Sequence, residues 1–347
     1  MGSRLKRLWR SISVMAVPKA AKNSKEPLAK PFSTSSPSCG VQFGFEQIKQ
    51  INRLKQFLSQ SASMLDLEQK VAEDRGMSQG IKTAVMVIGG GEDKVQDRKI
   101  LKAFVENCGQ SKARIAIIPC ASREPDIIGR IYYDIFTDIG AAHAEVLDIR
   151  ERPRLTEAEA NELVDGFTGV FMTGGDQLRL CGLIAETHLA LAIKERIRQG
   201  RIVLAGTSAG AAAMGYHMIS GGGSGEPPHK ELVNMSTGLD ILPEIIVDQH
   251  FHNRNRMARL MTAIAAHPDK LGIGIDEDTV AIFEPDNIMK VMGRGTVTVV
   301  DPGEVSYSNQ LWVSNAAPLT IHNMRVHILS AGSKYHLLKR IPMSPSI

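Results

Sequence analysis

The sequence predicts an α/β fold with a mainly parallel sheet and with strand hairpins toward the C-terminus. From residue 83 onward, short apolar runs alternate with amphipathic segments of helical spacing, which is typical of a parallel sheet covered by helices. After residue 270 the apolar runs follow one another more closely, which indicates an antiparallel edge or hairpins. The length of 347 residues fits one such domain with extensions.

Short apolar runs bounded by glycine or polar residues are expected to form the strands. In chain order they span residues 84–88, 114–118, 145–149, 169–172, 202–205, 245–247, 271–275, 280–283 and 296–300. One intervening helix is expected to begin after Thr156, because Glu159 three residues later completes a capping box. Residues 177–199 are expected to form one further helix. In such sheets the chemistry collects at the carboxyl ends of the strands.

The first 80 residues differ in composition from the rest of the chain. Residues 1–38 carry a net charge of +7, which leaves −3 for the remainder of a chain whose formal net charge is +4. We therefore expect residues 1–43 to be a basic extension that is disordered or serves for targeting. Residues 44–80 show helical spacing of apolar side chains and are expected to form an amphipathic helical extension.

The composition excludes several classes of protein. A body with a net negative charge does not fit a basic nucleic-acid binder. The four cysteines are scattered, without a C-x-x-C pair or zinc spacing, which favours a reduced compartment and gives no sign of a zinc site. No uninterrupted apolar run reaches the roughly 18 residues that a membrane span needs. We therefore expect a soluble, cytoplasmic protein with neither nucleic acid nor membrane as a partner.

One expected strand is followed at once by a tight turn and a helix. The run 202–205 leads into Gly-Thr-Ser-Ala-Gly (206–210) and then into helix-forming alanines. Small residues on both sides of Ser208 let the backbone turn sharply and leave the hydroxyl at a helix N-terminus. A serine so placed can be a nucleophile, with the amide of Ala209 facing an oxyanion. The alternative is that Ser208 only caps the helix, and this stretch leaves both roles open.

A dense polar cluster follows the expected strand 245–247. In it, His250 is a candidate general base, since an imidazole can take a hydroxyl proton at neutral pH. His252 competes for this role, because alternate strand residues share a face. Three arginines of the cluster either bind an acidic substrate or form a solvated patch; they are Arg254, Arg256 and Arg259.

An acidic run, Asp-Glu-Asp (276–278), ends another expected strand. One of its carboxylates could orient the histidine of a catalytic triad, with metal binding as the alternative. The triglycine turn 89–91 lacks the spacing of a dinucleotide site or a P-loop, so we expect a strand-to-helix turn and no cofactor. The turn 173–177 also ends a strand, and its glycines either let backbone amides approach a substrate carbonyl or serve the turn alone.

Five of these segments, in this order, resemble the cyanophycinase family of serine peptidases. They are 89–91, 173–177, 206–211, 248–251 with the arginines that follow, and 272–277. The resemblance spans about residues 84–301 and implies that 81–347 form a catalytic peptidase domain. The fold it implies is a three-layer α/β/α sandwich with a mainly parallel central sheet. That fold is flavodoxin-like, akin to aspartyl dipeptidases and class I glutamine amidotransferases, and it usually occurs as a homodimer.

The resemblance also assigns the catalytic groups, position by position. It makes Ser208 the nucleophile, His250 the base and Glu277 the carboxylate that orients His250, in that order along the chain. The choice between His250 and His252, which spacing leaves open, is decided by this resemblance alone. The amides of Gly175 and Ala209 would hold the oxyanion. No metal or organic cofactor is required.

The implied substrate is cyanophycin, multi-L-arginyl-poly-L-aspartate, with arginine joined to each β-carboxyl group of an aspartate backbone. The implied activity is that of an exopeptidase that releases β-Asp-Arg dipeptides. Residues that match the substrate pocket of the family are Gln177, Asp248, Arg254, Arg256 and Arg259. Asp248 could receive a substrate guanidinium group, and the arginines could pair with substrate carboxylates. Two alternatives are an aspartyl dipeptidase of the same fold and a non-catalytic cyanophycin-binding protein.

Overall fold

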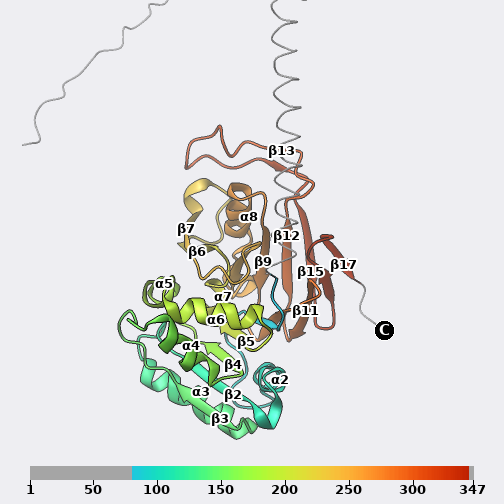
Figure 1. Ribbon diagram of the computed structural model, residues 1–347. Helices are drawn as coiled ribbons and strands as arrows, with labels where there is room; N and C mark the ends of the chain where they lie inside the picture. Colours follow the sequence, from blue (N-terminus) through green and yellow to red (C-terminus); the bar gives the residue numbers. More distant parts are fainter. Residues whose placement is uncertain (1–79, 344–347) are drawn as a thin grey trace, which may run out of the picture. The chain divides into compact units, whose positions relative to one another are not determined.

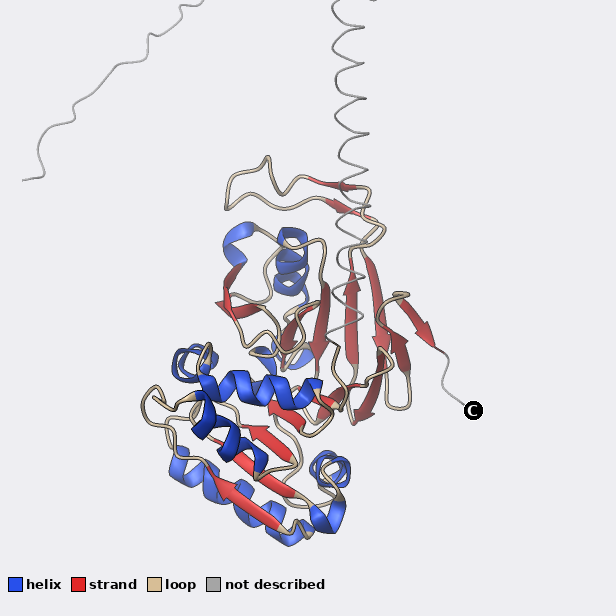
Figure 2. Ribbon diagram, viewed as in Figure 1, coloured by secondary structure: helices blue, strands red, loops and turns tan. Residues whose placement is uncertain are grey.

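A computed structural model describes residues 80–343, so the extension expected at 1–43 and all but the last residue of that at 44–80 lie outside the described residues. Figure 1 shows the described part as a sheet with helices on both faces, continued by a second group of strands and one further helix. Figure 2 gives the same view with helices and strands distinguished by colour. The three-layer α/β/α arrangement expected from the sequence is confirmed.

The central sheet has nine strands, in the order β17-β16-β11-β10-β1-β5-β4-β2-β3. Its parallel half consists of β1 (Val85–Ile88), β2 (Arg114–Ile118), β3 (His143–Val146), β4 (Gly169–Met172) and β5 (Val203–Thr207). Its antiparallel half consists of β10 (Thr279–Phe283), β11 (Ile288–Gly293), β16 (Lys334–His336) and β17 (Ile341–Met343). The closely spaced runs after residue 270 thus include the hairpins that the sequence predicts.

Alternate residues of the central strands pack against helices on opposite faces, as a parallel sheet requires. Met86 and Ile88 of β1 belong to the core beneath the helices α2 (Lys99–Asn107) and α3 (Pro125–Ile139). Val85 and Val87 belong to the core on the opposite face. The helices of that face are α4 (Glu157–Asp165), α5 (Gln177–Ile184), α6 (His188–Arg198) and α7 (Ala209–Ala212). Both faces of β1 are therefore buried, as expected for a strand between two layers of helices.

Helix starts follow from side-chain caps. Thr156 and Glu159 form the expected capping box at α4, with each side chain bonded to the other residue's amide. The single helix expected at 177–199 is wrong, because the chain breaks between α5 and α6. Glu186 there adopts a left-handed φ of 59°, and the Thr187 side chain caps α6 by accepting a hydrogen bond from the Ala190 amide.

A second, four-stranded sheet has the order β15-β12-β9-β8. The sequence did not predict that these strands form a separate sheet. Its strands are β8 (Ile245–Gln249), β9 (Leu271–Ile275), β12 (Val297–Asp301) and β15 (Arg325–Leu329). Helix α8 (Met257–Ala266) covers one face, where Leu260 and Ile264 pack with Ile246 and Val300. The remaining elements are β6 (His217–Gly222), β7 (Val233–Thr237), β13 (Tyr307–Ser308), β14 (Ile321–His322), and the 3₁₀ turns η1 (Gln110–Lys112), η2 (Lys230–Leu232) and η3 (His252–Arg254).

The turn after β1 joins the two sheets at the edge where β5, β8 and β9 also end. The Ser208 amide donates to the carbonyl of Ile88 at 3.0 Å, and the His250 amide donates to that of Gly89 at 2.9 Å. The Asp278 amide donates to the carbonyl of Gly90, also at 2.9 Å. Three segments that are distant in sequence therefore meet on one glycine turn.

Within residues 80–343, no helix is both long and apolar enough to cross a lipid bilayer. The same part of the chain holds no group of three or more His, Cys, Asp or Glu side chains with the spacing of a metal site. Its three cysteines, Cys108, Cys120 and Cys181, are buried free thiols. Burial raises the pKa of the Cys120 thiol to about 11, so this thiol stays protonated at neutral pH.

Candidate active site

Ser208 stands on a strained turn between β5 and α7. Its backbone has φ 51° and ψ −106°, a conformation that is costly for a residue with a side chain. Glycine is needed on either side. A Cβ on Gly206 would lie 2.5 Å from backbone atoms of Gly210, and one on Gly210 would lie 2.5 Å from the carbonyl oxygen of Met172. The Ser208 side chain makes no capping hydrogen bond to α7, so the helix-cap alternative is not what the geometry shows.

Ser208, His250 and Glu277 form a continuous chain of contacts. The Ser208 Oγ lies 2.9 Å from Nε2 of His250, and Nδ1 of His250 lies 2.6 Å from Oε1 of Glu277. An ionised carboxylate only accepts hydrogen bonds, so Nδ1 of His250 carries the proton and Nε2 is left to accept from the Ser208 hydroxyl. The arrangement can therefore move the hydroxyl proton onto the imidazole.

The triglycine turn 89–91 packs directly against the side chains of His250 and Glu277. A Cβ on Gly90 would lie 2.4 Å from Cε1 of the His250 ring, and one on Gly91 would lie 3.3 Å from the Glu277 side chain. Both glycines also have positive φ angles, 94° and 60°. The sequence predicts a tight turn here, but it does not predict that the turn packs against the imidazole ring of His250. Three successive glycines at a strand end were the available signal.

His252 is directed elsewhere. Its Nδ1 lies 3.0 Å from Oδ1 of Asp276, and its amide donates to the same oxygen at 2.9 Å. The other Asp276 oxygen accepts hydrogen bonds from the Thr296 amide and hydroxyl. Burial raises the pKa of Asp276, but these hydrogen bonds lower it more, so its pKa falls below the usual value. The contacts thus favour His250 over His252 as the partner of Ser208.

Two backbone amides beside Ser208 are free to bind a ligand. Within residues 80–343, the amides of Ala209 and Gly175 donate to no acceptor. A Cβ on Gly174 would lie 3.2 Å from Cβ of Ser208, which places the turn after β4 against the serine. Gly175 has a φ of 144°, and a Cβ there would lie 2.1 Å from the Ala121 carbonyl oxygen, so only glycine fits. Two unpaired amides beside a candidate nucleophile are candidate donors for an oxyanion.

Asp248, Arg256 and Arg259, which match the substrate pocket of the family by resemblance, form a buried cluster. The Asp248 side chain is 1 % exposed. Its carboxylate accepts hydrogen bonds from Arg259 Nε at 2.7 Å and from Arg256 Nη1 at 3.3 Å. Arg259 also donates through a second nitrogen to Oδ1. Burial raises the pKa of Asp248 while both guanidinium groups oppose that shift, and burial lowers the pKa of Arg256 to about 10. The carboxylate is therefore occupied by these arginines, a geometry that does not favour its binding a substrate guanidinium.

The other two expected pocket residues, Arg254 and Gln177, lie nearer the surface. Arg254 is exposed at the end of η3, and its charge acts on His250. Gln177 opens α5 and donates through Nε2 to the carbonyls of Ile219 and Ser220, both at 3.1 Å. A surface pocket of about 470 Å³ includes Gly175; it is lined by Ala121, Arg123, Gly175, Asp176, Gln177, Leu178 and Ser220.

The chain matches the model of peptidase family S51 over residues 85–291. The chain belongs to this family. A cyanophycinase of Trichormus variabilis is 56 % identical over 278 residues, which cover 80 % of this chain and 93 % of that protein. A cyanophycinase of Geminocystis herdmanii is 53 % identical over 77 % of this chain and 98 % of that protein. The crystal structure of a peptidase from an acI-B1 Actinobacterium has a similar fold, with a TM-score of 0.53, 19 % identity, and coverage of 75 % of this chain and 99 % of that one.

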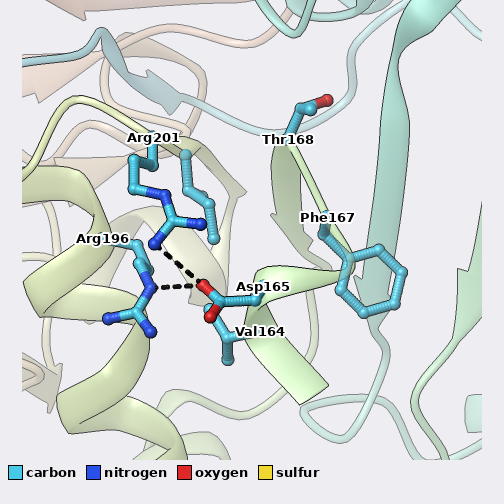
Figure 3. Close-up of a pocket in the computed structure, with 7 residues that line it drawn as sticks. Val164, Asp165, Phe167, Thr168, Arg196 and Arg201 are labelled. Carbon is cyan, nitrogen blue, oxygen red and sulfur yellow. Dashed lines mark hydrogen bonds and ion pairs between the residues drawn. The ribbon is translucent and has the colours of Figure 1, made fainter. Parts of the chain in front are cut away.

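A second cavity of this S51 peptidase, about 240 Å³ in volume, lies at the opposite edge of the sheet, ahead of β4 and β5 (Figure 3). Its charged side chains already pair with one another, because Asp165 accepts from Arg196 Nε at 2.6 Å and lies 3.1 Å from Arg201 Nη1. The hydrogen bond from Arg196 lowers the pKa of Asp165. These contacts tie the end of α4 to α6 and leave this cavity outside the candidate active site.

The pKa of His250 sets an expected pH dependence. Burial lowers it below the usual value of 6.5, the hydrogen bond that His250 donates to Glu277 opposes this, and the charge of Arg254 adds to the decrease. Because the base must be neutral, kcat/KM should be constant at neutral pH and fall as the pH drops through a midpoint below 6.5. The measurement is a pH profile of kcat/KM.

Glu277→Gln gives the matched control for this pH dependence. It removes the one group that raises the pKa of His250, so its midpoint should lie at lower pH still. The plateau should fall by roughly 10³- to 10⁴-fold, because the amide no longer fixes the tautomer of the imidazole. A profile whose midpoint does not respond to Glu277→Gln would contradict the contact between these two side chains.

Proposed function

We propose that this S51 peptidase is a serine exopeptidase that hydrolyses the backbone of cyanophycin and releases β-Asp-Arg dipeptides. The observation that carries the proposal is the contact chain from Ser208 through His250 to Glu277 beside two free backbone amides. The names of the similar proteins, cyanophycinases at 51 to 56 % identity, support the choice of substrate. The catalytic domain we propose is residues 81–347, acting as a homodimer in the cytoplasm.

The reaction we propose begins with attack of Ser208 Oγ on a backbone carbonyl between two aspartates, while His250 Nε2 takes the hydroxyl proton. The amides of Ala209 and Gly175 stabilise the negative charge on the carbonyl oxygen. His250 then gives its proton to the leaving amine as the C–N bond breaks, which leaves an acyl-enzyme. Water, deprotonated by His250, attacks the ester and frees the serine. Glu277 holds the imidazole in place throughout.

The pocket beside Gly175 suits the charge pattern of one repeating unit of the polymer. Each arginine of cyanophycin is attached through its α-amino group, so it presents a carboxylate and a guanidinium group together. Arg123 at the pocket is exposed and has no side-chain partner among the described residues. Asp176 uses Oδ1 to cap α5 and keeps Oδ2 free of partners in the same range. We propose that these two side chains bind the arginine unit.

Arg123→Ala should raise the KM for cyanophycin by about 10- to 100-fold and leave kcat nearly unchanged. A charged hydrogen bond is lost in both the ground state and the transition state, and such a loss costs about 1.5 to 3 kcal/mol. Initial rates over a range of polymer concentrations measure the effect. Arg130→Ala is the matched control, because this exposed arginine of α3 contacts Asp134 and the Tyr133 ring and does not line the pocket. An unchanged KM for Arg123→Ala would remove Arg123 from the substrate site.

One experiment decides the proposed function. The purified protein is incubated with insoluble cyanophycin and, separately, with short α-aspartyl dipeptides, and the products are identified by mass spectrometry. Soluble β-Asp-Arg released from the polymer alone is the expected result. Cleavage of the dipeptides alone would show an aspartyl dipeptidase. Binding to the polymer without release of product would show a non-catalytic binding protein.

A further inference from the structure

Glu92 is a buried carboxylate that the reaction described above does not use. It follows the triglycine turn, and its side chain is 1 % exposed. Its Oε2 accepts from the Thr207 hydroxyl at 2.6 Å, and its Oε1 accepts from Lys94 Nζ at 2.8 Å and from the Tyr132 hydroxyl. Burying a carboxylate is costly unless it is paired and hydrogen-bonded, so three donors converging on one side chain require a structural or functional reason.

The contacts of Glu92 lead to both halves of the catalytic arrangement. Thr207, the last residue of β5, immediately precedes Ser208, whose backbone is held at φ 51°. On the other side, Glu92 continues the turn whose Gly90 lies against the His250 ring. A strained residue keeps its conformation only when its surroundings fix it. The hydrogen bond between Glu92 and Thr207 is a direct link from that turn to the residue beside the nucleophile.

Burial decides how Glu92 can act. With 1 % of its side chain exposed, Glu92 cannot touch a polymeric substrate. Its partners Lys94 and Tyr132 attach it to the loop after β1 and to α3, and Lys94 balances its charge. Burial, together with the charge and hydrogen bond of Glu92, raises the pKa of Tyr132 well above the usual value, so that hydroxyl remains a donor.

We propose that Glu92 is a positioning residue of this peptidase, which acts through Thr207 to hold Ser208 at the correct distance from His250. This inference rests on the proposed function only in taking Ser208 as the nucleophile. It implies that the Glu92–Thr207 hydrogen bond contributes to kcat and not to substrate binding, because a displacement of about 1 Å at the reacting atoms costs about 10²-fold in rate.

Thr207 offers a matched pair of variants to test the inference. Thr207→Val keeps the shape of the side chain and removes the hydroxyl, whereas Thr207→Ser keeps the hydroxyl and removes a methyl group. We expect Thr207→Val to lower kcat about 10- to 100-fold with KM unchanged, and Thr207→Ser to stay within about threefold of wild type. Glu92→Gln should match Thr207→Val, and the double variant should be no slower than either single variant.

A purely structural role predicts a different pattern. Tyr132→Phe removes another hydrogen bond from the same carboxylate on the side away from Ser208, and we expect it to lower the melting temperature while kcat stays near the wild-type value. If kcat of all four variants simply follows their melting temperatures, or if Thr207→Val retains wild-type kcat, the inference is overturned. Because Thr207→Val is isosteric, the test stands even where Glu92→Gln does not fold.

A second assay separates this inference from the proposed function. The rate at which a small serine-reactive phosphonate labels Ser208 reports the reactivity of the hydroxyl without any cyanophycin. We expect slower labelling in Thr207→Val and Glu92→Gln and near wild-type labelling in Thr207→Ser. Failure of the wild type to cleave cyanophycin would refute the proposed function alone. Equal labelling rates in all variants would refute the positioning role alone.

Discussion

Ser208→Ala is expected to abolish release of β-Asp-Arg from cyanophycin, with kcat lowered by about 10⁴- to 10⁶-fold. Loss of a nucleophile removes the covalent route entirely, and only the contribution of the oxyanion amides and of substrate binding remains. The backbone strain at φ 51° is the same for alanine as for serine, because both have a Cβ. The variant should therefore fold like the wild type. The measurement is the rate of dipeptide release, followed by mass spectrometry at saturating polymer.

The control for this result is Ser330→Ala, which changes an exposed serine after β15 and should leave kcat at the wild-type value. Binding of Ser208→Ala to insoluble polymer should persist, because the pocket is intact. If the polymer is still solubilised at the wild-type rate by Ser208→Ala, the serine mechanism is wrong and the contact between Ser208 and His250 has another purpose.

The turn around Ser208 was predictable from sequence because its requirements are local. The glycines at 206 and 210 stand in one short stretch that an apolar strand and a helix flank. The clash that excludes a Cβ at Gly206 is with Gly210 in the same stretch, whereas the clash at Gly210 is with Met172 of β4 and is seen only in the structure. His250 was harder to assign. Strand periodicity left His250 and His252 equivalent, but the chain turns at His250 itself, where φ is 50°, so the two side chains do not share a face.

The separate second sheet was not predictable by the same means. Strand β9 is buried along its whole length, like β4 and β5 of the central sheet. A buried apolar run shows that both faces of a strand are covered, and it carries no information about which neighbour it pairs with. Pairing is decided by connections between distant residues, such as the parallel register of Val247 with Ile273.

The role of Asp248 is the point where sequence resemblance and geometry give different expectations. The resemblance places Asp248 in the substrate pocket, whereas the structure shows its carboxylate enclosed by Arg256 and Arg259. A list of charged residues at helical and strand spacing cannot tell whether they face a cleft or one another. The difference depends on how α8 lies against β8 and β9, which only the tertiary packing determines.

Asp248→Ala is therefore expected to lower the free energy of unfolding by about 3 to 5 kcal/mol. Removing one partner of a buried ion pair leaves the others charged and unpaired in a medium of low dielectric constant, and here two arginines lose the same carboxylate. Urea denaturation followed by circular dichroism measures the change. Asp134→Ala is the matched control, since it removes an exposed partner of Arg130 and such surface pairs contribute about 0 to 1 kcal/mol.

The same variant separates the two roles of Asp248. A buried support predicts lower stability together with reduced kcat, because the strand β8 that carries Asp248 leads directly to His250. A residue that binds substrate predicts wild-type stability together with a raised KM for cyanophycin, since only a contact with the polymer is lost. Wild-type stability in Asp248→Ala would show that the two arginines find other partners, and the carboxylate would then belong to the substrate pocket as the resemblance implies.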